Sequence, residues 1–472
     1  MAYNRKPNYH FRDKNQTGID KIPLGRMIIV EDYDGEVKTF LKKSNTGIDS
    51  STTIESFVKS QDKNHSELVE YQKIQGAIGN INNPLLDLPL NNSLAMKQGV
   101  GSVTFSRTTK ATYIDRYGVL QTADIDEPRF EKDGLLIEGA STNLLTYSEE
   151  FDNEVWTKTQ CTVTANDTVA PDGTNTADKL SSSSNDDDDY TLISQTYSTD
   201  VVEDDVYAVS VFVKKGNTDK ITLSAYFKGE NEYNYDFTFS TETASNSNMK
   251  VQKLDNGWYR LSYKIIATED SDDAYVISRV WGIGRGVDGT TDDHNYVWGF
   301  QLEKLPFATS YIPTTDSAVT RGNDLCEVTA KDNIPIINEG FTFLMTYTSN
   351  GFIPEKHLID FGSADRAGFI QQYGDAGFTY WNGSTDLTNK KSDMVLNSEL
   401  IGRTARIGMV VINKLPYCID DGIIIDNSLD REASISVPTT IKFGGGNHTN
   451  FGYIKNFKIW DKALTATEVA LA

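Results

Sequence analysis

The sequence is poor in the residues from which disulfide frameworks, metal centres and catalytic centres are usually built. Only three cysteines occur among 472 residues, and Cys161, Cys326 and Cys418 are far apart. An odd number at this spacing supports neither a set of disulfide staples nor a CxxC metal site, so we expect buried free thiols. The five histidines are equally scattered, without HExxH or HxH spacing, and each is expected to be structural or exposed.

Motifs for nucleophilic or nucleotide chemistry are also missing. The chain contains neither a GxSxG sequence nor a P-loop, and the glycine-rich stretch Gly282–Gly289 lies in a β hairpin, so we interpret it as a loop. A glycosidase would need two carboxyl groups that converge in a cleft, and position along the chain singles out no pair among 67 acidic residues. We therefore expect no enzymatic activity and no cofactor.

Long apolar runs are absent, and positive charge is in deficit. No run of about 18 apolar residues occurs, and the N-terminal MAYNRKPNYHFRDK has no apolar signal core. We therefore expect a soluble chain made in a cytoplasm, without membrane insertion. Lysine and arginine number 45 against 67 acidic residues, which gives a net charge of −22. Such a surface repels nucleic acid phosphates, so we expect no binding to nucleic acid.

Strand signals, in contrast, are abundant. Short alternating runs separated by turn residues, without helix-period segments between them, predict antiparallel sheets in a sandwich or jelly roll. We expect Gly134–Lys158 and Val297–Thr314 to supply the first and last strands of this sandwich. The runs between them that we expect to be strands are Tyr207–Lys215, Lys220–Lys228, Asn234–Ser240, Gly257–Ala267 and Ala274–Gly284.

A second sandwich is expected from Gly340 onward, after the connecting Ala318–Asn338. Its pieces include FTFLMTYT, HLIDFG, GFIQQYG, FTYWNGST, RIGMVVINK, YCIDDGIII and TIKFGGG. The aromatic-alternating GYIKNFKIWDKAL then precedes a short helix-like TATEV near the C-terminus. The predicted fold class is mainly β, with a small N-terminal α+β unit followed by two antiparallel β-sandwiches.

The N-terminal region predicts a small unit that needs a partner. IPLGRMIIVED predicts one strand, Asp34–Gly35 a hairpin turn, EVKTFLKKS the return strand, and STTIESFVKS a short helix. Two strands and one helix make a poor core, so we expect this unit to bind a partner surface or copies of itself. Before it, the basic and aromatic residues 1–21 are either a frayed end or an arm that becomes ordered on docking.

Ser66–Ile81 is the one stretch with a clear helical period. Its apolar residues recur about every three to four positions, and a lone helix of this length needs a cover for them. It packs either on its own domain or in a parallel bundle of several chains, where isoleucine favours more than two strands. The candidate oligomerisation residues are Leu68, Tyr71, Ile74, Ile78 and Ile81.

Two acidic stretches are candidate loops. Asp186–Asp189 is expected to be a solvated insertion, because like charges repel and extend the chain. The alternative is Ca²⁺ binding, which needs six to eight converging oxygens. Asp288–His294 has the same character.

Exposed aromatic rings beside amide and carboxylate groups are the candidate glycan-binding residues, because sugar faces stack on rings. Trp381, Tyr380, Asn382 and Asp386 form one such group, and Trp281 is a further candidate. For Trp281 and Tyr380 taken singly, packing in a core as strand residues is the preferred interpretation. The remaining tryptophans are expected in cores: Trp156, Trp258, Trp298 and Trp460.

Several blocks carry a family resemblance. LLDLPLNN, VTFSRTTKATYIDRYGVLQTA, EPRFE, GLLIEGASTNLLTYSEEF, APDGTNTADKL and QLEKLPFATSYIPT follow one another between about Leu85 and Arg321. Together they resemble a jelly-roll, carbohydrate-binding-module-like domain common in tailed-phage fibre, spike and head-fibre proteins. The long insertion SSSSNDDDDY departs from the usual pattern. The C-terminal KFGGG and GYIKNFKIWDKALTATE resemble a concanavalin A-like, laminin-G-type domain, a fold that commonly binds glycans.

The resemblance implies a phage virion appendage, a head or tail fibre that binds capsid or tail proteins and host-surface glycans. It also implies a homotrimer, and docking to the virion through Tyr3, Tyr9, Phe11 and Arg12. The alternatives are a polysaccharide-degrading tailspike enzyme and a purely structural capsid decoration. The expected parts are residues 1–21 (docking arm), 22–63 (anchoring module), 64–84 (trimerisation segment and linker), 85–320 (jelly roll) and 321–472 (concanavalin A-like sandwich).

Overall fold

The computed structural model describes residues 9–11, 27–31, 37–41, 79, 81–183, 191–227, 232–270, 275–284, 290–329, 333, 340–351, 353, 356–360, 368–371, 378–381, 391–394, 402–413, 415–425, 440–445 and 449–472. It divides into two compact units, one formed by Met1–Pro84 with Leu464–Ala472 and the other by Leu85–Ala463. The described chain is mainly β, as the sequence predicts.

The smaller unit contains a three-stranded sheet with the order β1-β2-β3. The predicted hairpin is confirmed, because β2 (Met27–Glu31) and β3 (Val37–Leu41) pair antiparallel. Part of the predicted docking arm forms a third strand, β1 (Tyr9–Phe11), parallel to β2. The C-terminal helix is confirmed as α3 (Ala466–Leu471), where Thr465 and Glu468 form a capping box.

The first sandwich of the larger unit consists of two six-stranded sheets, which we call the front and back sheets. All their named strand pairs are antiparallel, and the five predicted runs appear as β15, β16, β17, β20 and β21. The front sheet has the order β11 (Thr157–Thr159), β14 (Leu192–Ser198), β21 (Tyr275–Trp281), β16 (Lys220–Phe227), β17 (Tyr233–Thr238), β18 (Thr243–Ala244). The back sheet has the order β12 (Cys161–Thr168), β13 (Ala177–Ser182), β22 (His294–Glu303), β15 (Val206–Lys214), β20 (Trp258–Ile266), β19 (Lys250–Lys253).

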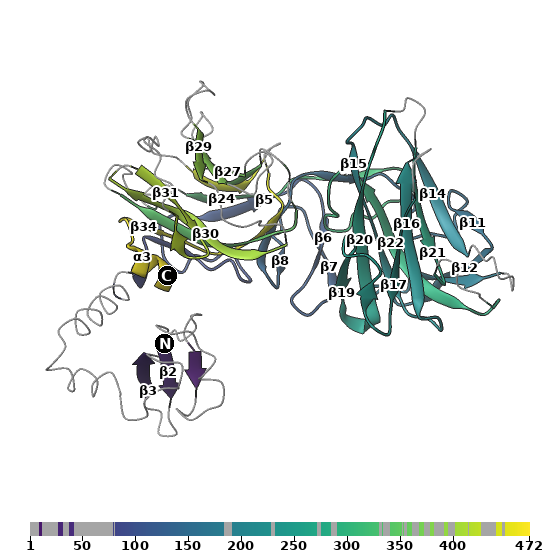
Figure 1. Ribbon diagram of the computed structural model, residues 1–472, viewed down its shortest axis with the longest axis horizontal. Helices are drawn as coiled ribbons and strands as arrows, with labels where there is room; N and C mark the ends of the chain where they lie inside the picture. The colour runs from purple at the N-terminus through teal and green to yellow at the C-terminus, as the bar shows by residue number, and fades with distance from the viewer. Residues whose placement is uncertain are drawn as a thin grey trace. The chain divides into compact units, whose positions relative to one another are not determined.

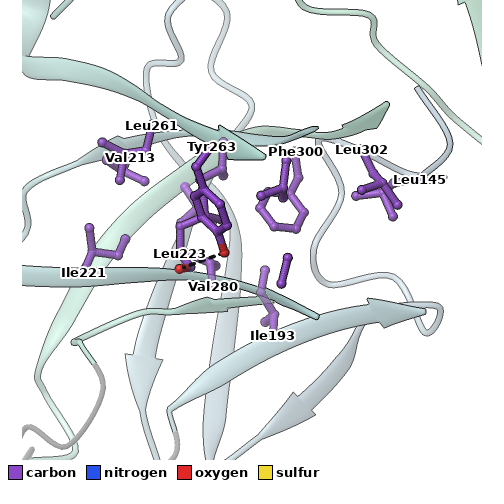
Figure 2. Packing of buried hydrophobic residues seen from close by; sticks show 14 of the residues in the cluster. Leu145, Ile193, Val213, Ile221, Leu223, Leu261, Tyr263, Val280, Phe300 and Leu302 are labelled. Carbon is purple, nitrogen blue, oxygen red and sulfur yellow. Dashed lines mark hydrogen bonds between the residues drawn. The ribbon is translucent and has the colours of Figure 1, made fainter. Parts of the chain in front are cut away.

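The core of the first sandwich fills the space between these sheets (Figure 2). Ile193, Leu223 and Val280 come from the front sheet, and Phe300 comes from the back sheet. Tyr263 crosses the core, where its hydroxyl donates to the backbone oxygen of Leu223 at 3.3 Å. The four tryptophans expected in cores are buried, as predicted.

The prediction that Val297–Thr314 supplies the last strand of the first sandwich is confirmed in chain order by β22, which takes a central place in the back sheet. It lies between β13 and β15, and its alternation changes phase within the strand. Val297 and Phe300 both face the core although they are three residues apart. Gly299 lies between them with a φ of +61°, where the register against β15 shifts. A β-bulge inserts one extra residue into the strand, so Val297 and Phe300 project to the same face although their positions differ by an odd number.

Replacing Gly299 with alanine should lower the free energy of unfolding by about 2–4 kcal/mol, from a left-handed backbone and overpacking. A Cβ there would lie 2.9 Å from Cδ2 of Phe212. Gly173→Ala is the matched control, because Gly173 has a φ of +85° and no atom within 4 Å of an added Cβ. Urea unfolding curves of both variants separate the two contributions. Equal losses would contradict the packing argument.

The second sandwich also consists of two sheets around one core, but its strands come from distant parts of the chain. One sheet has the order β29 (Lys391–Met394), β28 (Phe378–Trp381), β27 (Gly368–Gln371), β26 (His357–Asp360), β33 (Thr440–Gly444), β24 (Leu325–Thr329), β5 (Val103–Ser106). The other has the order β32 (Ile423–Ile424), β31 (Leu415–Asp420), β30 (Thr404–Ile412), β25 (Thr342–Ser349), β34 (Gly452–Trp460), β9 (Gly134–Ile137), β8 (Phe130–Glu131), and β4 (Leu86–Leu88) also pairs with β34.

The strand pairing makes the first sandwich an insertion within the second. Figure 1 shows the early strands β5 and β8, in blue, among the green and yellow strands β24, β30 and β34. The prediction that Gly134 begins the first sandwich is therefore corrected, because β9 pairs with β34. Likewise, the expected boundary between residues 320 and 321 does not follow sheet membership. The chain leaves and returns through paired strands, β10 (Ser141–Asn143) and β23 (Val319–Arg321).

A short hairpin completes the larger unit. Strands β6 (Ala111–Ile114) and β7 (Leu120–Ala123) pair antiparallel. Leu120 packs with Trp258, Trp298 and Phe212 in a small apolar cluster separate from the core between the two sheets. This hairpin therefore extends the hydrophobic packing of the first sandwich beyond its two sheets.

Five charged side chains form a buried ion-pair network in the second sandwich. The carboxylate of Asp324 lies 3.2 Å from Nη1 of Arg107 and 2.6 Å from Nη2 of Arg129. Oε2 of Glu138 lies 2.9 Å from Nη1 of Arg129 and 3.5 Å from Nη2 of Arg321. All five side chains are 2 % exposed or less. Burial alone would raise the pKa of Glu138, but Arg321 and Arg129 outweigh it and lower the pKa to about 2.

The cysteines agree in part with the prediction of buried thiols. Cys326 and Cys418 are free and buried, and burial raises the pKa of each thiol to about 12. Cys161 is free but only half-buried by accessible surface. Among the helices in the described part of the chain, none is long and apolar enough to cross a membrane.

Candidate functional site

A row of polar side chains crosses the outer face of the front sheet. Residues opposite one another in an antiparallel pair project to the same face, so the register defines the row. The residues next to the members of this row in each strand, including Ile193, Leu223 and Val280, project to the opposite face and into the core. We call this set the polar row: Thr157 on β11, Ser194 on β14, Arg279 on β21, Ser224 on β16 and Asn234 on β17.

One end of the polar row opens into a cavity of about 540 Å³. Thr157, Ser194 and Arg279 line it, so hydroxyl groups and a guanidinium converge there. Glu232 and Trp281 add a carboxylate and an indole ring. The volume lies in the range of small-molecule sites, and the lining is dominated by groups that form hydrogen bonds.

Three members of the polar row carry a buried polar atom without a hydrogen-bond partner among the described residues. These atoms are Oγ of Ser224, Oδ1 of Asn234 and Nε of Arg279. A buried polar group left unpaired costs about 1–3 kcal/mol, and such groups are rare in native proteins. A ligand or ordered water with both donors and acceptors would recover this free energy.

The guanidinium of Arg279 is held in a fixed orientation. Its Nη1 donates to Oε1 of Glu232 at 2.8 Å, and its Nη2 donates to the hydroxyl of Tyr226. Its Cζ also lies 4.6 Å from the centroid of the Tyr226 ring. An ion pair and a cation–π contact together restrict a long side chain, so Arg279 is preorganised as a donor.

Trp281 is the one predicted glycan-binding residue that lines this cavity. Its side chain is only 2 % exposed at the end of β21, which agrees with the interpretation of Trp281 as a buried strand residue and not with an exposed loop aromatic. A ring covered to this extent forms part of the cavity wall and offers little face for stacking.

The other predicted glycan-binding residues lie elsewhere. Tyr380 and Trp381 belong to β28 of the second sandwich, where they are in register with Phe369 and Gly368 of β27. Asn382 and Asp386 lie outside the described residues. The structure therefore separates Trp281 from Tyr380 and Trp381 into two different sandwiches.

Most of the remaining predicted sites lie outside the described residues. This holds for Leu68, Tyr71, Ile74 and Ile78 of the oligomerisation segment, for Tyr3 and Arg12 of the docking arm, and for the acidic run Asp186–Asp189. Ile81 is described and buried, and Tyr9 and Phe11 form the ends of β1. Within the described ranges, no group of three or more histidine, cysteine or acidic side chains is placed to hold a metal ion.

The sequence held a signal for the polar row that the prediction did not use. In KITLSAYFK, Thr222 and Ser224 alternate with Ile221, Leu223 and Ala225, which indicates a strand with one apolar and one polar face. Alternation does not reveal, however, that the polar face is itself buried. The complete row depends on the order of five strands, which only the fold supplies.

Comparisons with known proteins add little to this geometry. No family model matches the sequence, and no curated protein matches it either. Domains LG4-5 of the mouse laminin α1 chain are similar at 11 % identity, with 57 % of this chain and 86 % of that chain covered and a TM-score of 0.23. The CBM22-1–CBM22-2 tandem domain of Xyn10C from Paenibacillus barcinonensis is similar at 11 % identity, with 69 % of this chain and 99 % of that chain covered and a TM-score of 0.23. Trypanosoma rangeli sialidase is similar at 11 % identity, with 62 % of this chain and 60 % of that chain covered and a TM-score of 0.25. TM-scores this low assign the chain to no family, and its description as a pair of β-sandwiches rests on its own strand pairing.

Proposed function

We infer that this chain is a glycan-binding protein without catalytic activity, and that the cavity at the polar row is its sugar site. The observation that carries this proposal is a cavity lined by Thr157, Ser194 and a guanidinium, Arg279, that two neighbouring side chains hold in place. Sugars present several hydroxyl groups at close spacing, and each hydroxyl both donates and accepts. Such a ligand matches a cavity that is lined by hydroxyl, carboxylate and guanidinium groups.

The biological setting that we propose is a fibre of a tailed-phage virion, attached by its N-terminal unit to the head or tail. This part of the proposal rests on the sequence blocks that resemble phage fibre and spike proteins. A single cavity of this kind binds a sugar weakly. A homotrimer would raise the effective concentration of sites and convert weak contacts into firm adhesion to a host surface.

Replacing Arg279 with alanine should weaken glycan binding by about tenfold or more, because hydrogen bonds from charged groups contribute about 1.5–3 kcal/mol. The full chain would first be screened on an array of bacterial surface glycans, and hits would be titrated by calorimetry. Arg116→Ala is the control, because Arg116 is exposed in the β6–β7 turn. Circular dichroism would establish that both variants remain folded.

Two results would refute this function. One is an array without hits, or hits that Arg279→Ala binds as tightly as the native chain. The other is the release of new reducing ends from a bound polysaccharide, which would favour a polysaccharide-degrading enzyme instead.

A further inference from the structure

A second cavity lies between the back sheet of the first sandwich and the second sandwich. Its volume is about 520 Å³, and we call it the interlobe cavity. Arg260 and Lys250 face it from β20 and β19. Glu131, Asn350 and Tyr453 line it from the second sandwich. The amino group of Lys250 donates to the backbone oxygen of Asn350 at 3.0 Å, so the two sandwiches are in contact at its rim.

Arg260 is the unusual residue of this cavity. It is 8 % exposed, and its Nε is buried without a hydrogen-bond partner among the described residues. Its Nη2 donates to Oγ of Ser210 at 3.0 Å, and its Cζ lies 5.3 Å from the centroid of the Phe212 ring. These contacts fix the guanidinium but do not neutralise it. Burial lowers the pKa of Arg260, which reflects the cost of a charge removed from water.

The other buried arginines of the same unit have the partners that Arg260 lacks. Arg107, Arg129 and Arg321 each lie within 4 Å of a buried carboxylate. Within the described part of the chain, no acidic side chain lies within 4 Å of Arg260. The carboxylates of Glu303, Glu138 and Glu131 act on it from farther away, and they offset only part of the effect of burial on its pKa. A buried charge without a carboxylate in direct contact is unfavourable, so this position favours an external anion.

The acidic groups of the cavity restrict which anion fits. Glu138 is already neutralised by two arginines. Glu131 accepts hydrogen bonds from the backbone nitrogen of Ile114 at 2.9 Å and the hydroxyl of Tyr453 at 2.8 Å, and burial raises its pKa to about 7. Asp133 also lines the cavity. These oxygens accept from hydroxyl groups and repel a doubly charged phosphate more than a single carboxylate.

We propose that the interlobe cavity binds an acidic sugar, with the sugar carboxylate on Arg260 and its hydroxyl groups toward Glu131 and Tyr453. A planar guanidinium binds a carboxylate through paired hydrogen bonds. Lys250 adds a second positive charge at the rim. This site is separate from the cavity at the polar row, and either one can bind a sugar if the other does not.

The test uses the full chain and D-glucuronate, with D-glucose and inorganic phosphate as matched probes in titration calorimetry. Glucuronate should bind saturably and more tightly than either probe. Arg260→Met should weaken glucuronate binding by about tenfold or more, as expected for loss of hydrogen bonds from a charged group. Arg116→Ala should leave it unchanged, because Arg116 is exposed outside both cavities.

A second variant protects the test against misfolding of Arg260→Met. Ser210→Ala removes only the hydroxyl that holds Nη2 of Arg260, and it should weaken glucuronate binding by a smaller factor. The proposal is overturned if the native chain does not bind glucuronate, if glucose or phosphate binds equally well, or if folded Arg260→Met and Ser210→Ala both bind glucuronate like the native chain.

Discussion

Residues 321–472 expressed alone should fail to fold, although this segment contains most strands of the second sandwich. The fragment lacks β5, which pairs with β24, and β4 and β9, which pair with β34. Strand β8, which pairs with β9, is missing as well. It also lacks apolar side chains that fill the shared core. Those side chains are Leu86, Leu88, Leu90, Phe105, Leu135 and Ile137. Loss of so many buried groups exceeds the total stability of an ordinary domain, about 5–15 kcal/mol.

Residues 85–142 joined through a short turn to residues 320–472 should fold instead. Thr142 and Thr320 are opposite one another in the β10–β23 pair, and their hydroxyl oxygens lie 2.8 Å apart. Opposite residues of antiparallel strands are about 4.5–5.5 Å apart at Cα, so a hairpin turn of a few residues bridges the cut. The reciprocal fragment 143–318 keeps all strands of the front and back sheets and should also fold.

Near-ultraviolet circular dichroism and thermal unfolding would compare the three fragments. We expect a cooperative transition for the joined fragment and for residues 143–318, and none for residues 321–472. A cooperative transition in residues 321–472 would show that the early strands are not integral to the second sandwich.

Replacing Asp324 with alanine should lower the free energy of unfolding by about 3–5 kcal/mol, the loss typical of breaking a buried ion pair. Asp324 is a partner of two guanidinium groups, and it also accepts from the backbone nitrogen of Glu138 at 2.9 Å. Its removal leaves three buried arginines with one carboxylate. The guanidinium of Arg107 would keep only backbone oxygen partners, at Thr109 and in the β7 region.

The control is an ion pair of another aspartate, which lies at the surface and has a lysine as its partner. Asp124 lies 2.8 Å from Nζ of Lys110, and the two side chains are 73 % and 69 % exposed. Asp124→Ala should leave the unfolding midpoint in urea almost unchanged, because solvent screens such pairs. If the two substitutions shifted the midpoint equally, burial would not be what gives the network its contribution to stability.

The sequence was sufficient to predict strands, but not to predict which strands are neighbours. The runs that became β15, β16 and β20 have a clear two-residue period, and the structure confirms them within two residues at each end. A period shows which side chains share a face and carries no information on the partner strand. For this reason GLLI at residues 134–137 was assigned to the wrong sandwich.

The candidate sites were less predictable for the same reason. Exposed aromatics can be proposed from local sequence, whereas the polar row requires five strands in a particular order. Arg260 lies in the run WYRLSYKII, in which alternation places it on the face opposite the core. Nothing in that run shows that hairpin β8–β9 and β34 would cover this face and bury its charge. Sites of this kind arise from packing between distant segments.

The paired strands β10 and β23 have a consequence for how such a protein changes over time. Because the inserted lobe begins and ends at adjacent points, it can be exchanged for another lobe of similar end-to-end spacing without a cut through the host sandwich. All five charged residues of the ion-pair network lie in the host segments. Ser310 of the inserted lobe hydrogen-bonds to Glu138 and Arg129, so a replacement lobe would need an equivalent partner there. A lineage with this architecture can therefore acquire a new binding specificity by recombination at the β10–β23 strand pair.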